Sequence, residues 1–420
     1  MSEQITKIRA REVLDSRGNP TVECEIFTQT YRSRFIVPSG ASTGQYEAVE
    51  LRDNDPNRFH GKGVLKAVSN VNDTIAPKLI GMDPTDQKTI DSIMLDLDGT
   101  PNKSNLGANA ILSVSGAAAR LGAKVTGKHL FEYLGNSKRL PTPLLNVING
   151  GKHAGGNLAI QEFMIVPKGF DTFSEGLRAS SEVYHSLKKY LKEKYGSSSI
   201  NVGDEGGFAP QLDYAKDALA ALSMAINNAG YEVGEHFFFA IDAAASEFLH
   251  DGKYRIDGME LTADELLNYY LSLIDEYPAL ISLEDPFDEN DFESFAKLVK
   301  KIGKEKAIVG DDLTVTNVER INTAIQHQAM NYLLLKINQI GTLTEARNAF
   351  DLTKSQNWGV VVSHRSGETE DAFIADLAVG WGAERIKTGA PARSERVAKY
   401  NQLLRIEHLL GEEAKYYKGM

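Results

Sequence analysis

The segment between residues 307 and 391 decides the fold, because one short pattern occurs in it four times. The runs are AIVGDD (307–312), YLLLKIN (332–338), GVVVSH (359–364) and ERIKTGAP (384–391). Each run is largely aliphatic and leads to a polar or charged residue, namely Asp311, Lys336, His364 and Lys387. These residues are 25, 28 and 23 positions apart. A strand, its loop and a helix take about 30 residues, so each interval predicts one strand–helix unit.

The same pattern continues toward the N-terminus. Four further runs are LLNVING (144–150), EFMIV (162–166), FFFAID (237–242) and ALISLED (279–285). Continuous aliphatic runs are typical of parallel strands buried on both faces. Eight such runs in roughly 280 residues predict a (β/α)8-type barrel over residues 140–420, with functional groups at the carboxyl ends of its strands. A doubly wound open sheet is the competing architecture, although the G-x-G-x-x-G and P-loop motifs are absent.

Residues 1–139 have a different pattern and predict a smaller α+β domain. Alternating or continuous apolar positions indicate strands, and apolar residues at helical spacing indicate helices. The strands are expected at 22–26 and 34–37, and the helices at 64–75, 90–97 and 107–119, the last one buried. Strands followed by a run of helices are typical of an α+β domain. The Pro141-Thr142-Pro143 segment stiffens the chain and predicts the domain boundary just before it.

The composition limits the classes of function. With 46 Lys and Arg against 57 Asp and Glu, the 420-residue chain has a formal charge of −11, which disfavours nucleic acid and anionic lipid as general partners. Cys24 alone cannot form an intrachain disulfide, as expected in a reducing compartment. The N-terminal residues lack the apolar core of a signal peptide, and the uncharged 107–119 run is too short to span a bilayer. We therefore expect a cytoplasmic protein without a membrane span.

Three carboxylates close consecutive strands of the predicted barrel: Asp242, Glu284 and Asp311. On one face of a barrel they converge, and three crowded carboxylates persist only with a compensating cation. Oxygen ligands with room for water or substrate suit Mg2+, whereas the H-E-x-x-H and C-x-x-C motifs of zinc sites are absent. The alternative is that each carboxylate caps the helix after its strand. Their joint placement favours the metal site.

Cationic side chains follow the remaining strands. Lys336 follows three leucines and is either a tuned base or a snorkelling amine. His364, Arg365 and Ser366 supply donors for phosphate or carboxylate, and Lys387 ends the last run. Together with the acids they predict an anion site built around a metal. A ring of ion pairs that closes the barrel is the alternative.

Three glycine-rich loops accompany these strands. They are VPSGASTG (37–44), NGGKHAGG (149–156) and GDEGGFAP (203–210). Glycine allows close backbone approach to a ligand and allows hinge motion, so loops that cover a site are one interpretation and plain turns are the other. Glu205 is flanked by Asp204 and a glycine pair, which favours an acid positioned by a rigid loop.

Many of these segments resemble the signature segments of the enolase family. The matching stretches are DSRGNPTVE, SGASTG, GGKHAGG, QEFMIVP, GDEGGFAP, SLEDPF, GDDLTVTN, LLLKINQIGT, SHRSGETED and IKTGAPARSER. The likeness runs in order from Ile5 to Leu410 and departs at Lys152, where the family often has a small residue. It implies a hydro-lyase of glycolysis and gluconeogenesis that reversibly dehydrates 2-phospho-D-glycerate to phosphoenolpyruvate, with two Mg2+ per active site.

The resemblance also implies a role for each matching residue. The metal ligands would be Asp242, Glu284 and Asp311 for the first ion, and Ser42 for the second once substrate binds. Two catalytic residues would move protons: Lys336 as the base at C2, and Glu205 as the acid at the departing 3-hydroxyl. Glu162 would support the acid Glu205, and His153 would close over the substrate. The substrate-binding residues would be Gln161, His364, Arg365, Ser366 and Lys387. Because the base works neutral and the acid works protonated, we expect their pKa values to be shifted toward neutrality in opposite directions.

Three other interpretations stay open on the sequence. One is a related enzyme that dehydrates a sugar acid, and another is a barrel aldolase that uses Lys336 as a Schiff-base nucleophile. The third is a binding protein without catalysis. The resemblance further implies a homodimer or an octamer of dimers in the cytoplasm, with an additional cell-surface or secreted pool that binds host proteins.

Overall fold

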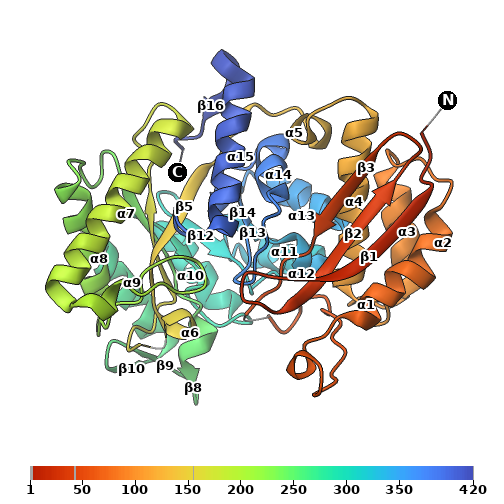
Figure 1. Cartoon of the computed structure of the whole chain (residues 1–420). Coiled ribbons are helices and arrows are strands. Elements are labelled where there is room, and N and C mark those ends of the chain that lie inside the picture. The colour runs from red at the N-terminus through yellow and green to blue at the C-terminus, as the bar shows by residue number, and fades with distance from the viewer. Residues whose placement is uncertain (1–2, 42–43, 155, 420) are drawn as a thin grey trace.

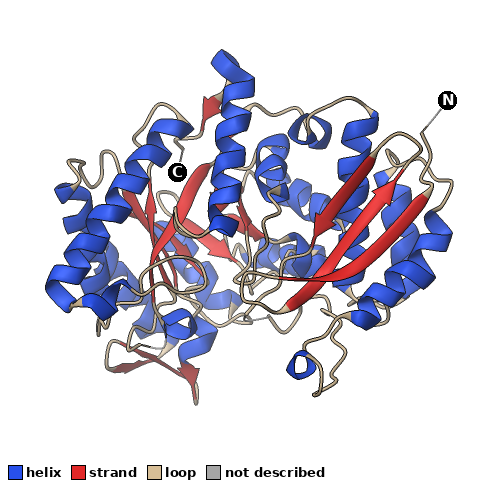
Figure 2. Cartoon of the chain, viewed as in Figure 1, coloured by secondary structure: helices blue, strands red, loops and turns tan. Residues whose placement is uncertain are grey.

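Two bodies lie side by side in the computed structural model (Figure 1), which describes residues 3–41, 44–154 and 156–419, without the side chains of residues 152 and 153. The first third of the chain forms a three-stranded sheet with helices packed behind it, and the rest forms a barrel surrounded by helices (Figure 2). The predicted architecture, a smaller α+β domain followed by a barrel, is confirmed. The open-sheet alternative is wrong, because the eight strands close on themselves.

The N-terminal sheet is antiparallel, and its strands are β1 (Lys7–Leu14), β2 (Pro20–Phe27) and β3 (Arg32–Ile36). β2 is almost wholly buried, and both predicted strands lie within β2 and β3 or directly beside them. β1 is a strand that the sequence did not indicate. Its KIRAREVL sequence carries charges throughout and its side chains are mostly exposed or half-buried, so it lacks the apolar alternation that identifies a strand.

Several helices complete this domain. The elements are a 3₁₀ turn (Phe59–Gly61), α1 (Leu65–Ser69), a π-helical turn (Asn70–Ile75), α2 (Ala76–Leu79), α3 (Gln87–Asp98), α4 (Ala108–Val125) and α5 (Leu130–Leu134). α3 begins where the Asp86 side chain accepts a hydrogen bond from the backbone of Thr89, as an N-cap residue does. α4 is buried along nearly its whole length and packs against β2 and β3. The predicted buried helix is therefore confirmed, and small side chains allow its close contact with the sheet.

Gly116 of α4 offers a direct test of this packing. A Cβ atom at this position would lie 2.5 Å from Cγ of Phe35, which is itself buried. Alanine is favoured over glycine in a helix by about 1 kcal/mol, but overpacking a tight core costs about 1–3 kcal/mol. Gly116→Ala should therefore lower the free energy of unfolding, measured in urea, by up to about 2 kcal/mol. Gly176→Ala in α7 (Phe173–Tyr195) is the control, since its Cβ would be 3.2 Å from the hydroxyl of Tyr416, and equal stability of both variants would contradict the prediction.

The second body is a closed barrel in the order β11-β12-β13-β14-β15-β5-β6-β7. Its strands are β5 (Thr142–Asn149), β6 (Glu162–Val166), β7 (Phe238–Asp242), β11 (Leu280–Glu284), β12 (Ala307–Gly310), β13 (Tyr332–Leu335), β14 (Gly359–Ser363) and β15 (Arg385–Lys387). These strands coincide with the eight predicted runs. Aliphatic side chains such as Leu144, Val309 and Leu334 fill one interior cluster, and the polar residues follow beyond it at the strand ends.

One strand of the barrel runs against the expected direction. β6 pairs antiparallel with both β5 and β7, whereas the other neighbouring pairs are parallel. The aliphatic runs indicated parallel strands in general, and β6 is the strand that departs from this pattern within the predicted (β/α)8-type barrel. The reversal has a consequence for the site, because it brings the first residue of β6, Glu162, level with the last residues of its neighbours, Asn149 and Asp242.

Helices surround the barrel (Figure 2). The longer ones after α7 are α8 (Ala215–Asn228), α9 (Ala263–Glu276), α10 (Phe292–Ile302), α11 (Val318–His327), α13 (Leu343–Ser355), α14 (Phe373–Trp381) and α15 (Ser394–Leu410). The short elements are α6 (Gly151–Ala154), α12 (Ile337–Ile340), 3₁₀ turns (Ser197–Ile200, Ala245–Phe248, Gly411–Glu413), β4 (Arg139–Leu140) paired with β16 (Lys415–Tyr416), and a small sheet of β8 (Leu249–His250), β9 (Lys253–Ile256) and β10 (Met259–Leu261). Among the described residues, no helix combines the length and apolar character needed to cross a bilayer.

Candidate active site

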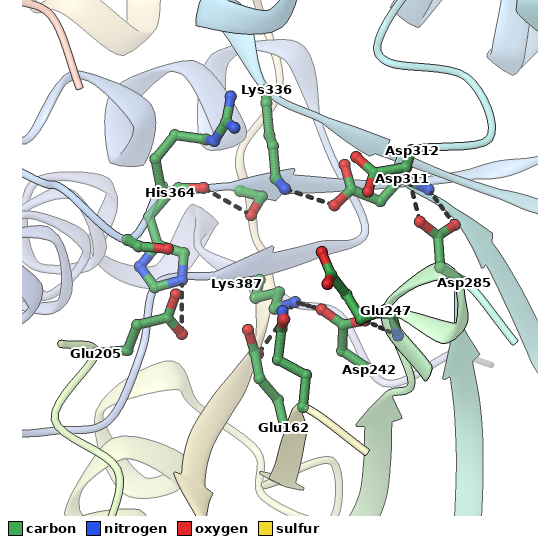
Figure 3. Close-up of a pocket in the computed structure, with 15 residues that line it drawn as sticks. Glu162, Glu205, Asp242, Glu247, Asp285, Asp311, Asp312, Lys336, His364 and Lys387 are labelled. Carbon is green, nitrogen blue, oxygen red and sulfur yellow. Dashed lines mark hydrogen bonds and ion pairs between the residues drawn. The ribbon is translucent and has the colours of Figure 1, made fainter. Parts of the chain in front are cut away.

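A cavity opens at the end of the barrel where the predicted site residues gather (Figure 3). The predicted residues that line it are Gln161, Glu162, Glu205, Asp242, Asp311, Lys336, His364, Arg365, Ser366 and Lys387. Glu284 is buried beside it, in contact with Lys387. Ser42 and the side chain of His153 lie outside the described residues. Residues that are more than 200 positions apart in the sequence therefore meet in one cavity.

Lys387, the last residue of β15, lies at the centre of a carboxylate cluster. Its Nζ is 2.8 Å from Oε1 of Glu284, 2.9 Å from Oδ2 of Asp242 and 3.1 Å from Oε2 of Glu162. We call these four residues the Lys387 cluster. Burial alone would lower the pKa of Lys387, but the surrounding carboxylates outweigh it and raise the pKa well above its usual range. Asp242 and Glu284 thus already converge on one cationic centre.

A second group of carboxylates lies next to this cluster. Ligand oxygens of Asp285, Asp311 and Asp312 come within 4.8 Å of one another. The two oxygens of Asp285 accept hydrogen bonds from the backbone of Asp311 and Asp312, at 2.9 and 2.7 Å. Asp285 is thus engaged in holding the backbone after β12. Burial, with the charge of Asp311 next, raises the pKa of Asp312 to about 8.

Lys336 follows β13 and reaches Asp311 across the cavity (Figure 3). Its Nζ is 2.5 Å from Oδ2 of Asp311, and its side chain is largely buried. Burial opposes a charge on Lys336, but the neighbouring carboxylate of Asp311 outweighs burial, and the pKa of Lys336 is raised. The sequence led us to expect that the pKa of Lys336 is lowered toward neutrality. This expectation is wrong, because the pKa is raised. Oδ1 of Asp311 accepts a further hydrogen bond from Gln339, at 2.9 Å.

Glu205 is held in the GDEGGFAP loop by contacts from two other segments, β5 and the loop after β14. Its Oε2 accepts a hydrogen bond from Asn146 at 3.0 Å and lies 3.5 Å from Nε2 of His364. Gly206 adopts a φ of 84°, and a Cβ on Gly207 would lie 2.8 Å from Oδ1 of Asn149. The glycine pair is needed here because one residue occupies the left-handed region and the other touches β5. The loop thus fixes Glu205 in a buried position.

The tautomer of His364 follows from its neighbours. Burial lowers its pKa to about 4, so the ring is neutral at pH 7. Its Nδ1 is 2.7 Å from Nη1 of Arg396, and a guanidinium can only donate. Nδ1 is therefore the acceptor and the ring proton is on Nε2, which faces Glu205. His364 consequently presents a donor to the side chain that was predicted to be the acid.

Arg365 and Ser366 occupy the loop after β14 and are both buried. The backbone carbonyls of these two residues accept hydrogen bonds from Arg396 at 2.6 and 2.5 Å. Arg365 also donates to Glu47, a residue of the N-terminal domain, from both terminal nitrogens. A buried guanidinium beside a serine is a donor set suited to a phosphate group.

Comparison with known proteins agrees with this geometry. Residues 5–134 match a family model described as the enolase N-terminal domain, and residues 137–420 match one described as the enolase C-terminal TIM barrel domain. The chain is 58% identical over 412 residues to the enolase of Methanocaldococcus jannaschii, an alignment that covers 97% of this chain and 96% of that protein. It is 56% identical to the enolases of Methanococcoides burtonii and Methanothrix thermoacetophila, with 98% and 99% of this chain and 97% and 98% of those proteins covered.

The chain belongs to the enolase family. It is accordingly a hydro-lyase, a phosphopyruvate hydratase that interconverts 2-phosphoglycerate and phosphoenolpyruvate in glycolysis. Of the interpretations left open by the sequence, the sugar-acid dehydratase, the aldolase and the purely non-catalytic binding protein are therefore set aside. The predicted family resemblance, fold and reaction are confirmed.

Several residues that shape this enolase site were missed in the sequence. Arg396 lies on α15 and is fully buried, and besides His364 and the two carbonyls it donates to the carbonyl of Asp204 at 2.9 Å. It therefore links the Glu205 loop to the loop after β14. Nothing in SERVAKY distinguishes it from a surface arginine on an amphipathic helix. Asn146 was hidden in the same way, because it lies within an otherwise aliphatic strand run.

The donor set fits a hard divalent cation. Asp242, Glu284 and Asp311 offer only carboxylate oxygens, the ligand type that Mg2+ prefers. Oε2 of Glu284 is buried and has no hydrogen-bond partner among the described residues. Burial, with the charge of Asp242 next, raises the pKa of Glu284 well above its usual range. A cation would relieve both the unsatisfied oxygen and the repulsion between neighbouring carboxylates.

Proposed function

We propose that the cavity carries out the dehydration with Lys336 as the base and Glu205 as the acid. The observation that carries this assignment is that the two side chains enter the same cavity from different sides, beside the Lys387 cluster (Figure 3). A base and an acid on different sides suit a reaction that removes a proton from one carbon and a hydroxyl from the next. Glu162 supports the acid side, because it is buried near Glu205 and its charge interacts with that carboxylate.

The substrate chemistry explains the density of charge at this site. A proton next to a carboxylate is weakly acidic, and its removal places a second negative charge on that group. Enolase-superfamily sites are themselves a standard example of a Lys base combined with Mg2+. Mg2+ held by Asp242, Glu284 and Asp311, and a second ion that Ser42 helps to hold, would supply positive charge where it develops. The Lys387 ammonium would contact the substrate carboxylate in the same region.

The two proton movements are assigned to protein groups. Lys336 removes the proton from C2. Glu205 donates a proton to the 3-hydroxyl, which leaves as water, and the electron pair of the broken C–H bond becomes the new carbon–carbon double bond. Asn146 and His364 hold the Glu205 carboxyl through the contacts described above. His153, whose side chain lies outside the described residues, is proposed to close over the substrate.

The remaining residues bind the substrate. Arg365 and Ser366 contact its phosphate, because a guanidinium and a hydroxyl are suited donors and both residues line the cavity. His364 lies beside them. Gln161 is placed near the substrate, and its buried Oε1 has no partner among the described residues, so the amide is available to a bound water or ligand.

A magnesium titration tests the assignment of two ions. We expect calorimetry of the chelator-treated protein to give one Mg2+ per chain, and two in the presence of 2-phosphoglycerate. The ultraviolet absorbance of phosphoenolpyruvate should rise only with Mg2+ present and should stop on addition of a chelator, because the ions stabilise the developing charge. Full turnover in the chelated protein, or a single ion in the presence of substrate, would contradict the proposal.

We further propose the assembly and location expected of the family. The chain is proposed to act on its small-molecule substrate as a homodimer or as an octamer of dimers, without nucleic acid. Its location is proposed to be the cytoplasm, with a cell-surface or secreted pool that binds host proteins. The boundary between the domains is placed between residues 139 and 140, and the stiff Pro141-Thr142-Pro143 segment directly after it supports that position.

A further inference from the structure

Glu47 connects the two domains at the phosphate side of the cavity. It belongs to the loop that follows β3, whereas its partner Arg365 follows β14 of the barrel. Oε2 of Glu47 is 2.9 Å from Nη1 of Arg365, and Oε1 is 3.0 Å from Nη2. Only 7% of the Glu47 side chain and 4% of the Arg365 side chain are exposed. Glu47 and Arg365 thus form a buried, bidentate ion pair.

This contact determines how the guanidinium is oriented. A carboxylate that accepts from both terminal nitrogens fixes the plane and the axis of the group, because two parallel hydrogen bonds leave no rotation. Oδ1 of Asn338 accepts a third hydrogen bond from Nη1, at 3.1 Å. The side chain of Arg365 is therefore held by protein groups from two domains.

Glu47 also has contacts on either side of this pair. Its Oε1 accepts a hydrogen bond from the backbone of Gly44 at 3.1 Å, within the glycine-rich loop, and lies 3.5 Å from Nε2 of Gln339. The same nitrogen of Gln339 donates to Asp311 at 2.9 Å, and its amide oxygen accepts from Thr316 at 2.9 Å, which fixes the orientation of the amide. One carboxylate therefore contacts the loop, the guanidinium and a neighbour of the proposed metal ligand Asp311.

We propose that Glu47 is a positioning residue for phosphate recognition, acting through Arg365. The inference rests on the proposed function, in which Arg365 binds the substrate phosphate. Glu47 holds the guanidinium in one orientation at the wall of the cavity before the substrate arrives. Preorganisation of this kind lowers the entropy lost on binding. Because the carboxylate belongs to the N-terminal domain, that domain takes part in the specificity of a site built mainly on the barrel.

A double-mutant cycle distinguishes this role from a structural one. Glu47→Gln keeps the shape of the side chain but removes the charge and one acceptor. We expect it to raise KM for 2-phosphoglycerate and the inhibition constant of inorganic phosphate by about 10- to 100-fold, the range of a lost charge-assisted hydrogen-bond pair. In an Arg365→Lys background the same change should alter both constants by no more than about twofold, because the group through which Glu47 acts is absent.

Two further variants complete the design. Glu47→Asp keeps the charge and should recover part of the phosphate affinity. Glu50→Gln is the matched control on the same loop, because Glu50 pairs with Arg52 instead of Arg365, and it should leave both constants near those of the unmodified protein. Thermal unfolding of each variant shows whether it is folded.

The outcomes separate the inference from the function on which it rests. Equal losses from Glu47→Gln in both backgrounds would show a structural role and overturn the inference. Tighter phosphate binding by Glu47→Gln would overturn it as well, because Glu47 would then be a competitor of the ligand. If Arg365→Lys alone left KM and phosphate inhibition unchanged, the proposed phosphate site itself would be wrong.

Discussion

Replacing Lys336 by alanine is expected to lower kcat by about 100- to 10,000-fold, the contribution of a positioned general base. Lys336 enters the cavity beside Asp311, and alanine leaves no group there that can accept the C2 proton. Substrate binding should change much less, because the proposed phosphate donors and Lys387 are retained. Steady-state rates of phosphoenolpyruvate formation, measured at saturating Mg2+, give kcat and KM separately.

Exchange of the C2 proton with solvent deuterium provides the sharper readout. Lys336→Ala should lose this exchange, since proton removal at C2 is the step assigned to the lysine. Lys297→Ala is the matched control, because Lys297 is an exposed lysine paired with Asp264 on the outer surface. Exchange at the normal rate in Lys336→Ala would assign the base to another group.

The strands of the barrel were predictable because burial on both faces leaves a continuous aliphatic signal in the sequence. The direction of β6 was not predictable from EFMIV itself, since an aliphatic run has the same composition in either direction. A signal was present in the connection: residues 150–161 are rich in glycine, and those of them that the structure describes form only the short α6. A parallel crossover usually contains a full helix, and the described part of this twelve-residue link has only the four-residue α6, so the link favours an antiparallel neighbour.

The candidate site was predictable where its residues follow a strand, because the end of each run marks one position on the barrel rim. Glu205 was predictable from its glycine-rich loop. The site was not predictable where a side chain reaches it from a helix or from the other domain. Arg396 comes from a helix and Glu47 from the other domain, and neither position carries a periodic signal. The direction in which the pKa of Lys336 is shifted was also not predictable from the sequence. It depends on the 2.5 Å contact with Asp311, which only the folded chain creates.

Neutralising Glu284 is expected to separate stability from activity. Glu284→Gln removes one of the crowded carboxylates of the Lys387 cluster, while Asp242 and Glu162 still pair with the ammonium. The chelated variant should therefore be at least as stable as the chelated unmodified protein, because relief of carboxylate repulsion offsets the lost contact to Lys387. Its kcat should fall by about 1,000-fold, since a bound metal ion contributes several kcal/mol to the transition state.

The response of thermal unfolding to Mg2+ shows whether Glu284 is a metal ligand or only an ion-pair partner of Lys387. A cation that binds only the folded protein stabilises it by about 2.7 kcal/mol at 100 times its dissociation constant, and Glu284→Gln should lose most of this gain. Glu384→Gln is the control, because Glu384 is also a buried glutamate and pairs with Arg139 and Lys354. It lies directly before β15, at the opposite end of that strand from Lys387. This control should lose about 1–3 kcal/mol of stability through its broken charged hydrogen bonds but keep its full response to Mg2+. If Glu284→Gln also kept the full response, Glu284 would be a structural partner of Lys387. The metal ligands would then have to include other carboxylates, with Asp285 and Asp312 the candidates beside Asp311.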